Sequence, residues 1–546
     1  MSADVLIIGL GGAGGVAADV LTAAGADVLA LEAGPALSAA DSLRDELANE
    51  AQARLSAPKA LAEAPLWRAH EGDTAGPSPW PVLMVNGVGG STVHFPGLYA
   101  RFHPWNFASR TRTVERYGAA ALPAASTLAD WPFSYEEIEP AYMAIERTIG
   151  VAGGETSPFA GPRSGPYPMG PLRRTGWTRL TDGAARTLGW HPFPAPAAIN
   201  SQPYNGNPEC SYCGYCSGNV CHRDAKGSTD VTAVRRALAT GRLRVLTGAR
   251  VTRIDTDGDG LASGATFVAD GRRQQVRARC VMLATFVYEN VRLLLLSRSP
   301  AHPAGLANGS RQVGRHYMAH ITPHVFGVFP GRRLQMHTGL WAQATCVEEW
   351  NADNFDHAGL GFIGGGLLTA PHELRPIAIA SAPLPDGVPR WGEGWARWLR
   401  EHARSIGYLT AQMECLAYED HVLDLDPAAR DPHGVPRIRV TMRVRDNERA
   451  GAAFLSERMT EWLRAAGAQR TWQAREPAIE ARHCYGGTRM GDDPASSVLD
   501  AHGFAHEVPN LAVLGASAFP TTGGHNPTLT VQALAWRTAT HWAARA

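Results

Sequence analysis

The sequence predicts an α/β fold that is α+β overall, with a parallel-stranded domain at the start and a second domain beside it. Residues 1–35 show an apolar strand, a glycine-rich turn, an amphipathic helix and another apolar strand. The chain has 546 residues, more than one hydrophobic core usually organises. Beyond residue 35, β-rich and helical stretches follow one another without an internal repeat. These observations favour at least two folding units of mixed architecture.

The remaining elements are predicted from periodicity and from helix-breaking residues. An Ala-, Glu- and Leu-rich stretch predicts a helix over 41–64, and a Pro/Gly/Ser break follows at 76–80. Apolar spacing predicts further helices over 135–149, 231–239, 450–466 and 528–544. Runs rich in β-branched residues predict strands within 243–256, 264–284 and 437–445.

The charge composition argues against polyanionic partners. Lys and Arg total 51, Asp and Glu total 51, and the formal net charge is zero. No overall basic field therefore favours nucleic acid or an anionic membrane surface. The apolar stretches fall short of the ~20 residues that span a bilayer, and no secretory signal precedes the first strand. We expect a cytoplasmic protein whose eight cysteines are not structural disulfides.

The first turn carries a dinucleotide-binding fingerprint. Gly9-Leu10-Gly11-Gly12-Ala13-Gly14 lies between a strand and a helix, which is the context that this motif requires. Gly9 allows the tight turn, Gly11 lets the backbone approach a pyrophosphate, and Gly14 lets the helix pack on the strand. Free N–H groups at the helix N-terminus bind the phosphates. Glu32 ends the second strand, where an acid bonds the ribose hydroxyls. The segment Glu32-Ala33-Gly34-Pro35 resembles the ending common in flavoprotein domains and so suggests FAD, and a nicotinamide dehydrogenase is the alternative at this stage.

Three further motifs resemble those of the glucose–methanol–choline (GMC) oxidoreductase family. The first is Asn86-Gly87-Val88-Gly89-Gly90-Ser91-Thr92, similar to the GxGGSS-type loop beside the flavin. The second is His483-Cys484-Tyr485-Gly486-Gly487-Thr488-Arg489-Met490-Gly491, similar to H-x-x-G-T-x-x-M-G. The third extends from Gly515 to Thr530 and contains Gly524-His525-Asn526-Pro527-Thr528. Their order and spacing extend the resemblance from the first residues to the last.

The sequence departs from the family pattern at two places. Gly487 stands where the family has threonine, and Thr488 comes one residue later. Residues 283–292 replace the commoner A-G-A-x-x-[ST]-P-R run after a late apolar strand. That variant, with Gln312-Val313-Gly314-Arg315-His316 and Asp130-Trp131-Pro132, is similar to the sugar-acid and glucose dehydrogenase branch of the family.

The resemblance implies a discontinuous Rossmann-type FAD-binding domain and a substrate-binding domain that contains an antiparallel sheet. The FAD-binding parts are expected at 1–110, 201–329 and 476–546, and the substrate-binding parts at 111–200 and 330–475. The resemblance also implies which residues bind FAD. Besides the first glycines and Glu32, they are Gly89, Gly90, Ser91, His94, Val251, Ala516, Asn526, Pro527 and Thr528.

The resemblance further implies the chemistry. His483 corresponds to the catalytic histidine, which takes the hydroxyl proton while a hydride passes to flavin N5. Asn526 corresponds to the partner position and orients the substrate oxygen. His94 lies near the position where some members attach the flavin covalently, and noncovalent packing beside the flavin is the alternative. Histidines outside the motifs receive no role, among them His103 and His320.

A cysteine-rich segment could hold an inorganic centre. Its cysteines are Cys210, Cys213, Cys216 and Cys221. Four thiols at such spacing suit an iron–sulfur cluster or zinc, and some membrane-bound dehydrogenases of the branch carry an iron–sulfur cluster. The spacing differs from the ferredoxin run, and similar segments occur in relatives that work with FAD alone. Structural thiols are the first interpretation, and an iron–sulfur cluster is the second.

The sequence therefore predicts FAD-dependent oxidation of a CH–OH group of a sugar-like, aminosugar-like or aminoglycoside-like alcohol to the carbonyl. An acidic cluster at Glu414, Glu419 and Asp420 either receives a cationic amino sugar or is a solvated acidic face. Two alternatives remain: the flavin subunit of an electron-transfer dehydrogenase with an iron–sulfur cluster, and a non-redox flavoprotein. The sequence leaves open the substrate, the electron acceptor (dioxygen or another) and the oligomeric state.

Overall fold

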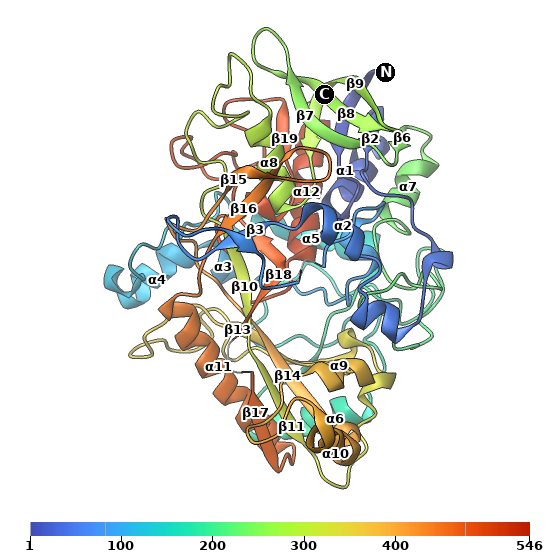
Figure 1. Ribbon diagram of the computed structural model, residues 1–546, viewed down its shortest axis with the longest axis vertical. Helices are drawn as coiled ribbons and strands as arrows, with labels where there is room; N and C mark the ends of the chain where they lie inside the picture. Colours follow the sequence, from blue (N-terminus) through green and yellow to red (C-terminus); the bar gives the residue numbers. More distant parts are fainter. Residues whose placement is uncertain (1, 82, 475–476, 546) are drawn as a thin grey trace.

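A computed structural model describes residues 2–81, 83–474 and 477–545 of the chain. Two large sheets occupy the two ends of the long axis, and both termini lie near the upper sheet (Figure 1). The upper sheet has the strand order β6-β2-β1-β9-β8-β7, with β19 paired to β9. Its strands are β1 (Ser2–Ile8), β2 (Val28–Leu31), β6 (Leu243–Leu246), β7 (Arg250–Thr256), β8 (Ala262–Ala269), β9 (Arg272–Leu283) and β19 (Leu511–Val513).

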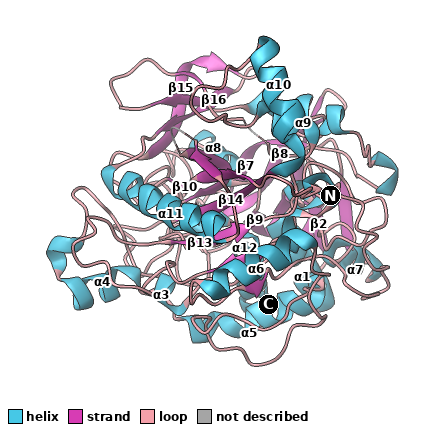
Figure 2. Cartoon of the chain, turned by 90° about the horizontal axis from the view of Figure 1, so that it is seen from below, coloured by secondary structure: helices cyan, strands magenta, loops and turns pink. Residues whose placement is uncertain are grey.

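The parallel strands of this sheet come from the beginning, the middle and the end of the chain. β1 pairs in parallel with β2 and β9, and β19 pairs in parallel with β9. Residues 5–8 are buried because the sheet is covered, as parallel strands require. Helix α1 packs against α12 and α7, and α12 packs against α5; in Figure 2, α5 lies opposite β15 and β16. These helices are α1 (Gly12–Ala23), α5 (Tyr135–Ile149), α7 (Ala233–Ala239) and α12 (Thr528–Ala543).

The lower sheet is antiparallel, with the order β17-β11-β14-β13-β12-β5, and β10 joins β14 to β18. Every residue of β14, in its centre, is buried. Helix α11 (Asp446–Ala465) packs on β14 and β11, and α6 (Gly176–Thr187) packs on α11. The strands are β5 (Phe193–Pro194), β10 (Met318–Thr322), β11 (His324–Val328), β12 (Thr345–Val347), β13 (Gly366–Ala370), β14 (Ile406–Met413), β17 (Arg470–Gln473) and β18 (Ala478–Tyr485).

A small sheet with the order β15-β16-β3-β4 lies at the side of the two large ones. Its strands are β3 (Leu66–Arg68), β4 (Gly76–Pro77), β15 (Val422–Arg430) and β16 (Pro436–Thr441). The remaining α-helices are α2 (Ala57–Glu63), α3 (Pro104–Phe107), α4 (Ser109–Tyr117), α8 (Val287–Leu296), α9 (Pro376–Ser381) and α10 (Gly392–His402). Within the described residues, every helix is too short or too polar to cross a membrane.

The predicted α/β fold with a second, antiparallel sheet is confirmed, but one predicted helix is wrong. Instead of one helix over 41–64, the chain forms a short π-helix at Leu47–Ala51 and the separate helix α2 at Ala57–Glu63. Arg44 and Ala53 have positive φ angles of 43° and 45°, which interrupt a helix. Pro58 fits only the first turn of α2. The Glu46 carboxylate accepts a hydrogen bond from the Ile377 backbone N–H. Contacts with distant residues therefore determine the conformation of this stretch.

The strand pairings cross the predicted domain limits. β10 and β11 were expected in the FAD-binding part 201–329, and β18 in the part 476–546, yet all three belong to the lower sheet. β3, within 1–110, pairs with β16 of the part 330–475. We therefore propose domain limits that follow the sheets, with the change to the lower sheet before Met318 and not at residue 330.

Candidate active site

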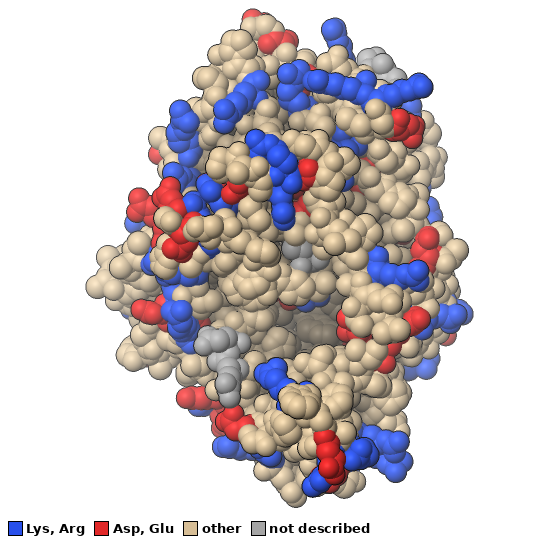
Figure 3. All heavy atoms as spheres, in the orientation of Figure 1, with Lys and Arg blue, Asp and Glu red and all other residues tan. Residues whose placement is uncertain are grey.

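A cavity of about 470 Å³ lies where the two large sheets meet. The ends of β1 and β2 and the residues after β9 line it from above, and β14 and β18 line it from below. The surface is hollowed between the upper and lower halves of the molecule (Figure 3). Predicted site residues from all over the chain line this one cavity: Gly9, Gly11, Gly12, Glu32, Gly90, Ser91, His94, Val251, His483, Ala516, Asn526, Pro527 and Thr528.

The glycines of the two N-terminal motifs pack against each other and leave no room for side chains. A Cβ on Gly90 would lie 2.8 Å from the Cα of Gly11. Gly14 is absent from the cavity lining and packs against the end of β1, since a Cβ there would lie 2.0 Å from the Gly9 carbonyl oxygen. Gly89 supports the loop at a φ of 89°. The glycines therefore have the two roles that the motif predicts. Some of them leave the backbone accessible to a ligand, and Gly14 lets α1 pack closely on β1.

Glu32 lies at the other edge of this glycine cradle. Its carboxylate accepts hydrogen bonds from the backbone N–H groups of Leu10 and Gly34, both at 2.9 Å. Burial raises the pKa of Glu32, and the two N–H groups act in the opposite direction. Val251 lines the same end of the cavity. Glycine backbone, a helix N-terminus and a buried acid fit the ADP half of FAD.

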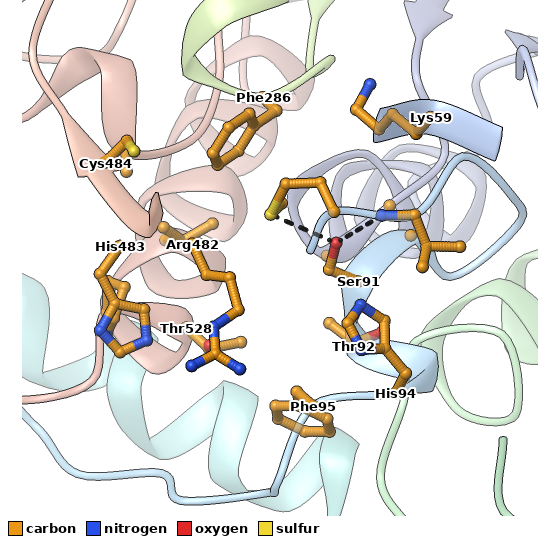
Figure 4. Close-up of a pocket in the computed structure, with 18 of the residues that line it drawn as sticks. Lys59, Ser91, Thr92, His94, Phe95, Phe286, Arg482, His483, Cys484 and Thr528 are labelled. Carbon is orange, nitrogen blue, oxygen red and sulfur yellow. Dashed lines mark hydrogen bonds between the residues drawn. The ribbon is translucent and has the colours of Figure 1, made fainter. Parts of the chain in front are cut away.

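The flavin half of the cavity holds buried polar atoms that lack a hydrogen-bond partner among the described residues. They are His94 Nε2 and Asn526 Oδ1. Burial, with Lys226 and Arg482 nearby, lowers the pKa of His94 to about 3, so its imidazole is neutral. His94 and Phe95 project into the cavity from one side, and His483 and Arg482 from the other (Figure 4). Unsatisfied polar atoms facing this space are what a polar isoalloxazine ring would satisfy.

His483 lies at the meeting point of three strands. Its Nδ1 lies 3.0 Å from Gln412 Oε1 on β14 and 3.1 Å from His320 Nδ1 on β10. Its Nε2 lies 3.4 Å from Asn526 Nδ2. Burial lowers the pKa of His483 to about 4, although Glu480 opposes this effect. The side chain therefore faces Asn526 as a neutral imidazole.

The hydrogen bonds determine which His483 nitrogen carries the proton. His320 Nε2 lies 2.7 Å from the Gly523 carbonyl oxygen, which can only accept, so this nitrogen is protonated. Burial, with His483 nearby, lowers the pKa of His320 to about 3, so its Nδ1 has no proton and is an acceptor. His483 Nδ1 thus lies between two acceptors, which are 3.2 Å from each other, and shares its proton between them. Its Nε2 keeps the free lone pair, directed towards Asn526, as a proton-accepting base requires.

Gln412 is a positioning residue in this arrangement, because it accepts from His483 Nδ1. For Gln412→Leu we expect kcat to fall roughly tenfold with little change in KM, since the imidazole loses an orienting partner of the kind that fixes a tautomer. In Gln412→Glu the carboxylate still accepts and also raises the pKa of His483, so most activity returns while the acid limb of the pH profile moves upwards. Steady-state kinetics across pH measures both effects. An unchanged kcat in Gln412→Leu would contradict the role.

Sequence reasoning missed Gln412 and His320. His320 was given no role because no motif contains it. A weak signal for Gln412 exists, since Tyr408, Thr410 and Gln412 alternate along an otherwise apolar strand and all line the cavity. Alternation of this kind marks one polar face of a buried strand, but it does not say what that face meets.

The departure from the family at Gly487 has a backbone reason. Gly486 and Gly487 have φ angles of 73° and 93°, where a β-branched residue is strained. Thr488, one residue later, is fully buried, and its backbone N–H donates to the Ser517 carbonyl oxygen at 3.0 Å. The shifted threonine therefore joins the second and third motifs, and His483 keeps its place beside Asn526.

The acidic cluster predicted as one candidate site for an amino sugar does not face the cavity. Glu414 is buried and accepts a hydrogen bond from Asn106 Nδ2 at 2.5 Å. Asp420 is paired with Arg443 and Arg445. Neither residue, nor Glu419, is part of the cavity lining. The prediction that this cluster receives a substrate is therefore wrong.

Acidic and basic side chains, paired with one another, line the lower part of the cavity instead. Arg482 Nε and Nη2 lie 2.6 and 2.5 Å from the two Glu480 oxygens, and its side chain is 41% exposed towards the cavity. Arg375 is paired with Glu373 and Glu50. The three carboxylates of this part, on Glu50, Glu373 and Glu480, therefore all have basic partners, but they share two guanidinium groups.

The cysteine-rich segment packs directly on the loop that carries His94. The Gly218 N–H donates to the His94 carbonyl oxygen at 2.8 Å, and Lys226 Nζ donates to the carbonyls of Cys216 and Phe95. All four sulfurs are free thiols. The side chains border one small cavity: Cys210, Cys213, Cys216 and Cys221.

The spacing of those thiols argues against zinc. Among the described residues, three ligand atoms come within 4.8 Å of one another in one group only, which contains none of these cysteines. Thiolates bound to one zinc ion lie about 3.8 Å apart. An iron–sulfur cluster separates its thiolates further, because iron and sulfide lie between them.

The fold and the cavity together define a class of protein. A glycine cradle for a dinucleotide opens into a polar cavity whose wall presents a neutral histidine beside an asparagine, as in a flavin-dependent oxidoreductase. A family model described as GMC oxidoreductase matches residues 423–535. The gluconate 2-dehydrogenase flavoprotein of Pantoea cypripedii is 29% identical, with 100% of this chain and 93% of that protein covered. Paromamine 6'-oxidase of Streptomyces fradiae is 30% identical, with 98% and 90% covered.

A solved structure supports the same fold. Formate oxidase from Aspergillus oryzae superimposes with a TM-score of 0.64 at 16% identity, covering 100% of this chain and 98% of that one. The chain belongs to the GMC oxidoreductase family. It is accordingly an FAD-dependent enzyme that acts on CH–OH groups.

Proposed function

We propose that this enzyme oxidises a secondary or primary CH–OH group of a sugar-like alcohol to the carbonyl, with His483 as the base and Asn526 as the group that orients the substrate oxygen. The observation that carries the proposal is the pair His483 Nε2 and Asn526 Nδ2, 3.4 Å apart in the cavity that the glycine motifs also line. FAD, when bound, supplies the hydride acceptor.

The hydrogen bonds of His483 and Asn526 give the two residues different roles. His483 Nε2 has the free lone pair and takes the hydroxyl proton, while its own N–H remains on the Gln412 side. Asn526 Nδ2 donates to the substrate oxygen, which fixes the direction of the carbinol C–H bond. The N-terminus of α12 begins at Thr528, in the cavity lining, and favours negative charge there.

The cavity favours a neutral polyhydroxylated substrate over a strongly charged one. Tyr408, Thr410 and Gln412 present polar groups, and the Glu480–Arg482 pair offers both donors and acceptors. Because each carboxylate in the lower part of the cavity already has a basic partner, a sugar or sugar alcohol is the first candidate. An amino sugar is the second, with Glu480 or Glu373 as its partner.

An anaerobic screen for bleaching of the flavin absorbance tests the proposal. Neutral sugars and sugar alcohols are expected to reduce the flavin faster than aldonic acids or aminoglycosides at equal concentration. If no alcohol of any of these classes bleaches the flavin, the oxidation chemistry is refuted and a non-redox role is indicated. If only the aminoglycosides bleach it, the substrate order is reversed and the chemistry stands.

The mode of flavin attachment is tested separately. We propose that His94 packs against the flavin without a covalent bond; its neutral imidazole has an unpartnered Nε2 that can hydrogen-bond to a noncovalently held flavin. Denaturation followed by filtration should release all of the flavin. Flavin that stays with the polypeptide, and is released in His94→Ala, would establish a covalent bond instead.

An electron-transfer role with an iron–sulfur cluster is the second candidate function. The observation that favours it is the cavity bordered by all four cysteines, in a segment bonded to the His94 loop. Iron and acid-labile sulfide should both be near zero if the thiols are structural, which remains our first interpretation. Stoichiometric iron and sulfide, lost in Cys213→Ser, would reverse that order.

A further inference from the structure

A second polar cluster lies behind the loop that carries Asn526. His103 Nε2 lies 3.1 Å from Glu348 Oε2, and His525 Nε2 lies 3.2 Å from the same oxygen. The two imidazole rings are stacked, with centroids 4.9 Å apart. All three side chains are buried, with exposed fractions of 4%, 3% and 2%. Their ligand atoms all lie within 4.8 Å of one another.

We propose that His103, Glu348 and His525 bind a divalent transition-metal ion, zinc being the first candidate, with Asn351 as a fourth ligand. Two imidazole nitrogens and a carboxylate oxygen are a ligand set that zinc accepts. Bonds of about 2.0–2.1 Å in a tetrahedron place neighbouring ligand atoms about 3.3 Å apart. The contacts at 3.1 and 3.2 Å are close to that spacing and need only small adjustments.

Asn351 provides the second, independent observation. Its side chain is fully buried, and its Oδ1 has no hydrogen-bond partner among the described residues. Amide oxygen and nitrogen exchange places by a simple flip. The flipped amide places an oxygen where Nδ2 now lies, 3.0 Å from His525 Nε2, which is a ligand position. The atom that lacks a partner thus becomes the fourth ligand.

Charge around the cluster also favours a cation. Glu348 is one buried carboxyl group, and Glu414 is another. They are linked through Asn106, whose Nδ2 donates to Glu414 and whose Oδ1 accepts from the His103 backbone N–H at 2.8 Å. A cation beside Glu348 offsets the cost of burying its carboxylate.

The proposed ion joins three segments that are far apart in the chain. His103 immediately precedes α3, Glu348 follows β12, and His525 precedes Asn526. The ion would hold the loop that carries Asn526 against the lower sheet, so its role is structural. The inference rests on the cluster itself and does not require the proposed function.

Metal analysis of the purified holoenzyme tests the proposal directly. We expect roughly one zinc or similar ion per FAD, retained after desalting, as for a closed structural site. A strong chelator should remove the ion and lower Tm by several degrees, and added Zn²⁺ should restore Tm. The chelator-treated protein should also take up Co²⁺ and develop visible d–d bands at wavelengths beyond the flavin absorption.

Variants locate the ion. Glu348→Gln keeps the size of the side chain and removes the anionic ligand, so the metal-to-FAD ratio should fall at least tenfold. His421→Gln is the matched control: it changes another buried histidine outside the cluster and should keep the full metal ratio. Circular dichroism and FAD content identify any variant that fails to fold, and in that case the wild-type measurements alone decide.

Three results would overturn the proposal. One is a wild-type enzyme that contains no stoichiometric metal and gains none with Zn²⁺ or Co²⁺, which leaves a proton-only cluster. The second is a metal content that survives in folded Glu348→Gln. The third is metal lost together with acid-labile sulfide, which places it at the cysteines. Failure of alcohol oxidation leaves these readouts unchanged, so the two proposals are tested separately.

Discussion

His483→Ala should reduce the rate of flavin reduction by alcohol by roughly 10²–10⁴-fold, equivalent to about 3–5 kcal/mol of transition-state stabilisation. The reason is positional: His483 Nε2 has the free lone pair that faces Asn526, and the base is lost with the ring. Burial lowers the pKa of His483 to about 4. A base works while it is neutral, so the wild-type rate should be flat near neutral pH and fall as the pH drops through about 4.

Stopped-flow reduction under anaerobic conditions measures this effect without involving the electron acceptor. Asn526→Ala should slow flavin reduction less, roughly tenfold to a hundredfold, because it disturbs the orientation of the substrate and leaves the base in place. His541→Ala, on the far part of α12, is the control and should reduce the flavin at the wild-type rate. FAD content must be equal in all variants. If His483→Ala retains rapid bleaching, another group is the base.

The second large effect is a loss of stability in mild acid. Burial lowers the pKa values of four histidines well below the unfolded value of about 6.5: His316 and His320 to about 3, and His357 and His421 to about 4. Between pH 6.5 and 4 the unfolded chain binds protons that the native protein excludes, so the free energy of unfolding rises with pH. As pH falls through this window, each histidine lowers the free energy of unfolding by up to about 1.4 kcal/mol per pH unit. The four together lower it by roughly 5 kcal/mol per pH unit.

Thermal unfolding at constant ionic strength from pH 8 to pH 5 measures this dependence. Tm should be nearly constant above pH 7 and should fall steeply below about pH 6. His421→Gln should flatten part of the slope, because both His421 ring nitrogens lack partners among the described residues and little else is lost. A Tm that does not change between pH 7 and pH 5 would show that these histidines are protonated in the native protein.

Elements that depend on neighbouring residues were predictable. The helix over 135–149 has Ser134 as its cap and Gly150 after its end, so its limits are encoded within one stretch and match α5. The stretch 41–64 has an equally helical composition but lacks such limits. Its glutamates bond across the molecule to Arg375 and to the backbone of Ile377, which composition does not reveal.

The candidate site divides in the same way. The nucleotide cradle was predictable from sequence by itself, because glycines at fixed spacing are required wherever backbone approaches backbone, as at Gly11 and Gly90. The histidine network was decided by tertiary structure alone. Gln412 and His320 meet His483 only because β14, β10 and β18 are adjacent strands, with partners 71 and 163 residues apart in the chain. The cluster of His103, Glu348 and His525 likewise exists only where three distant segments converge, since side-chain chemistry of this kind leaves no local pattern.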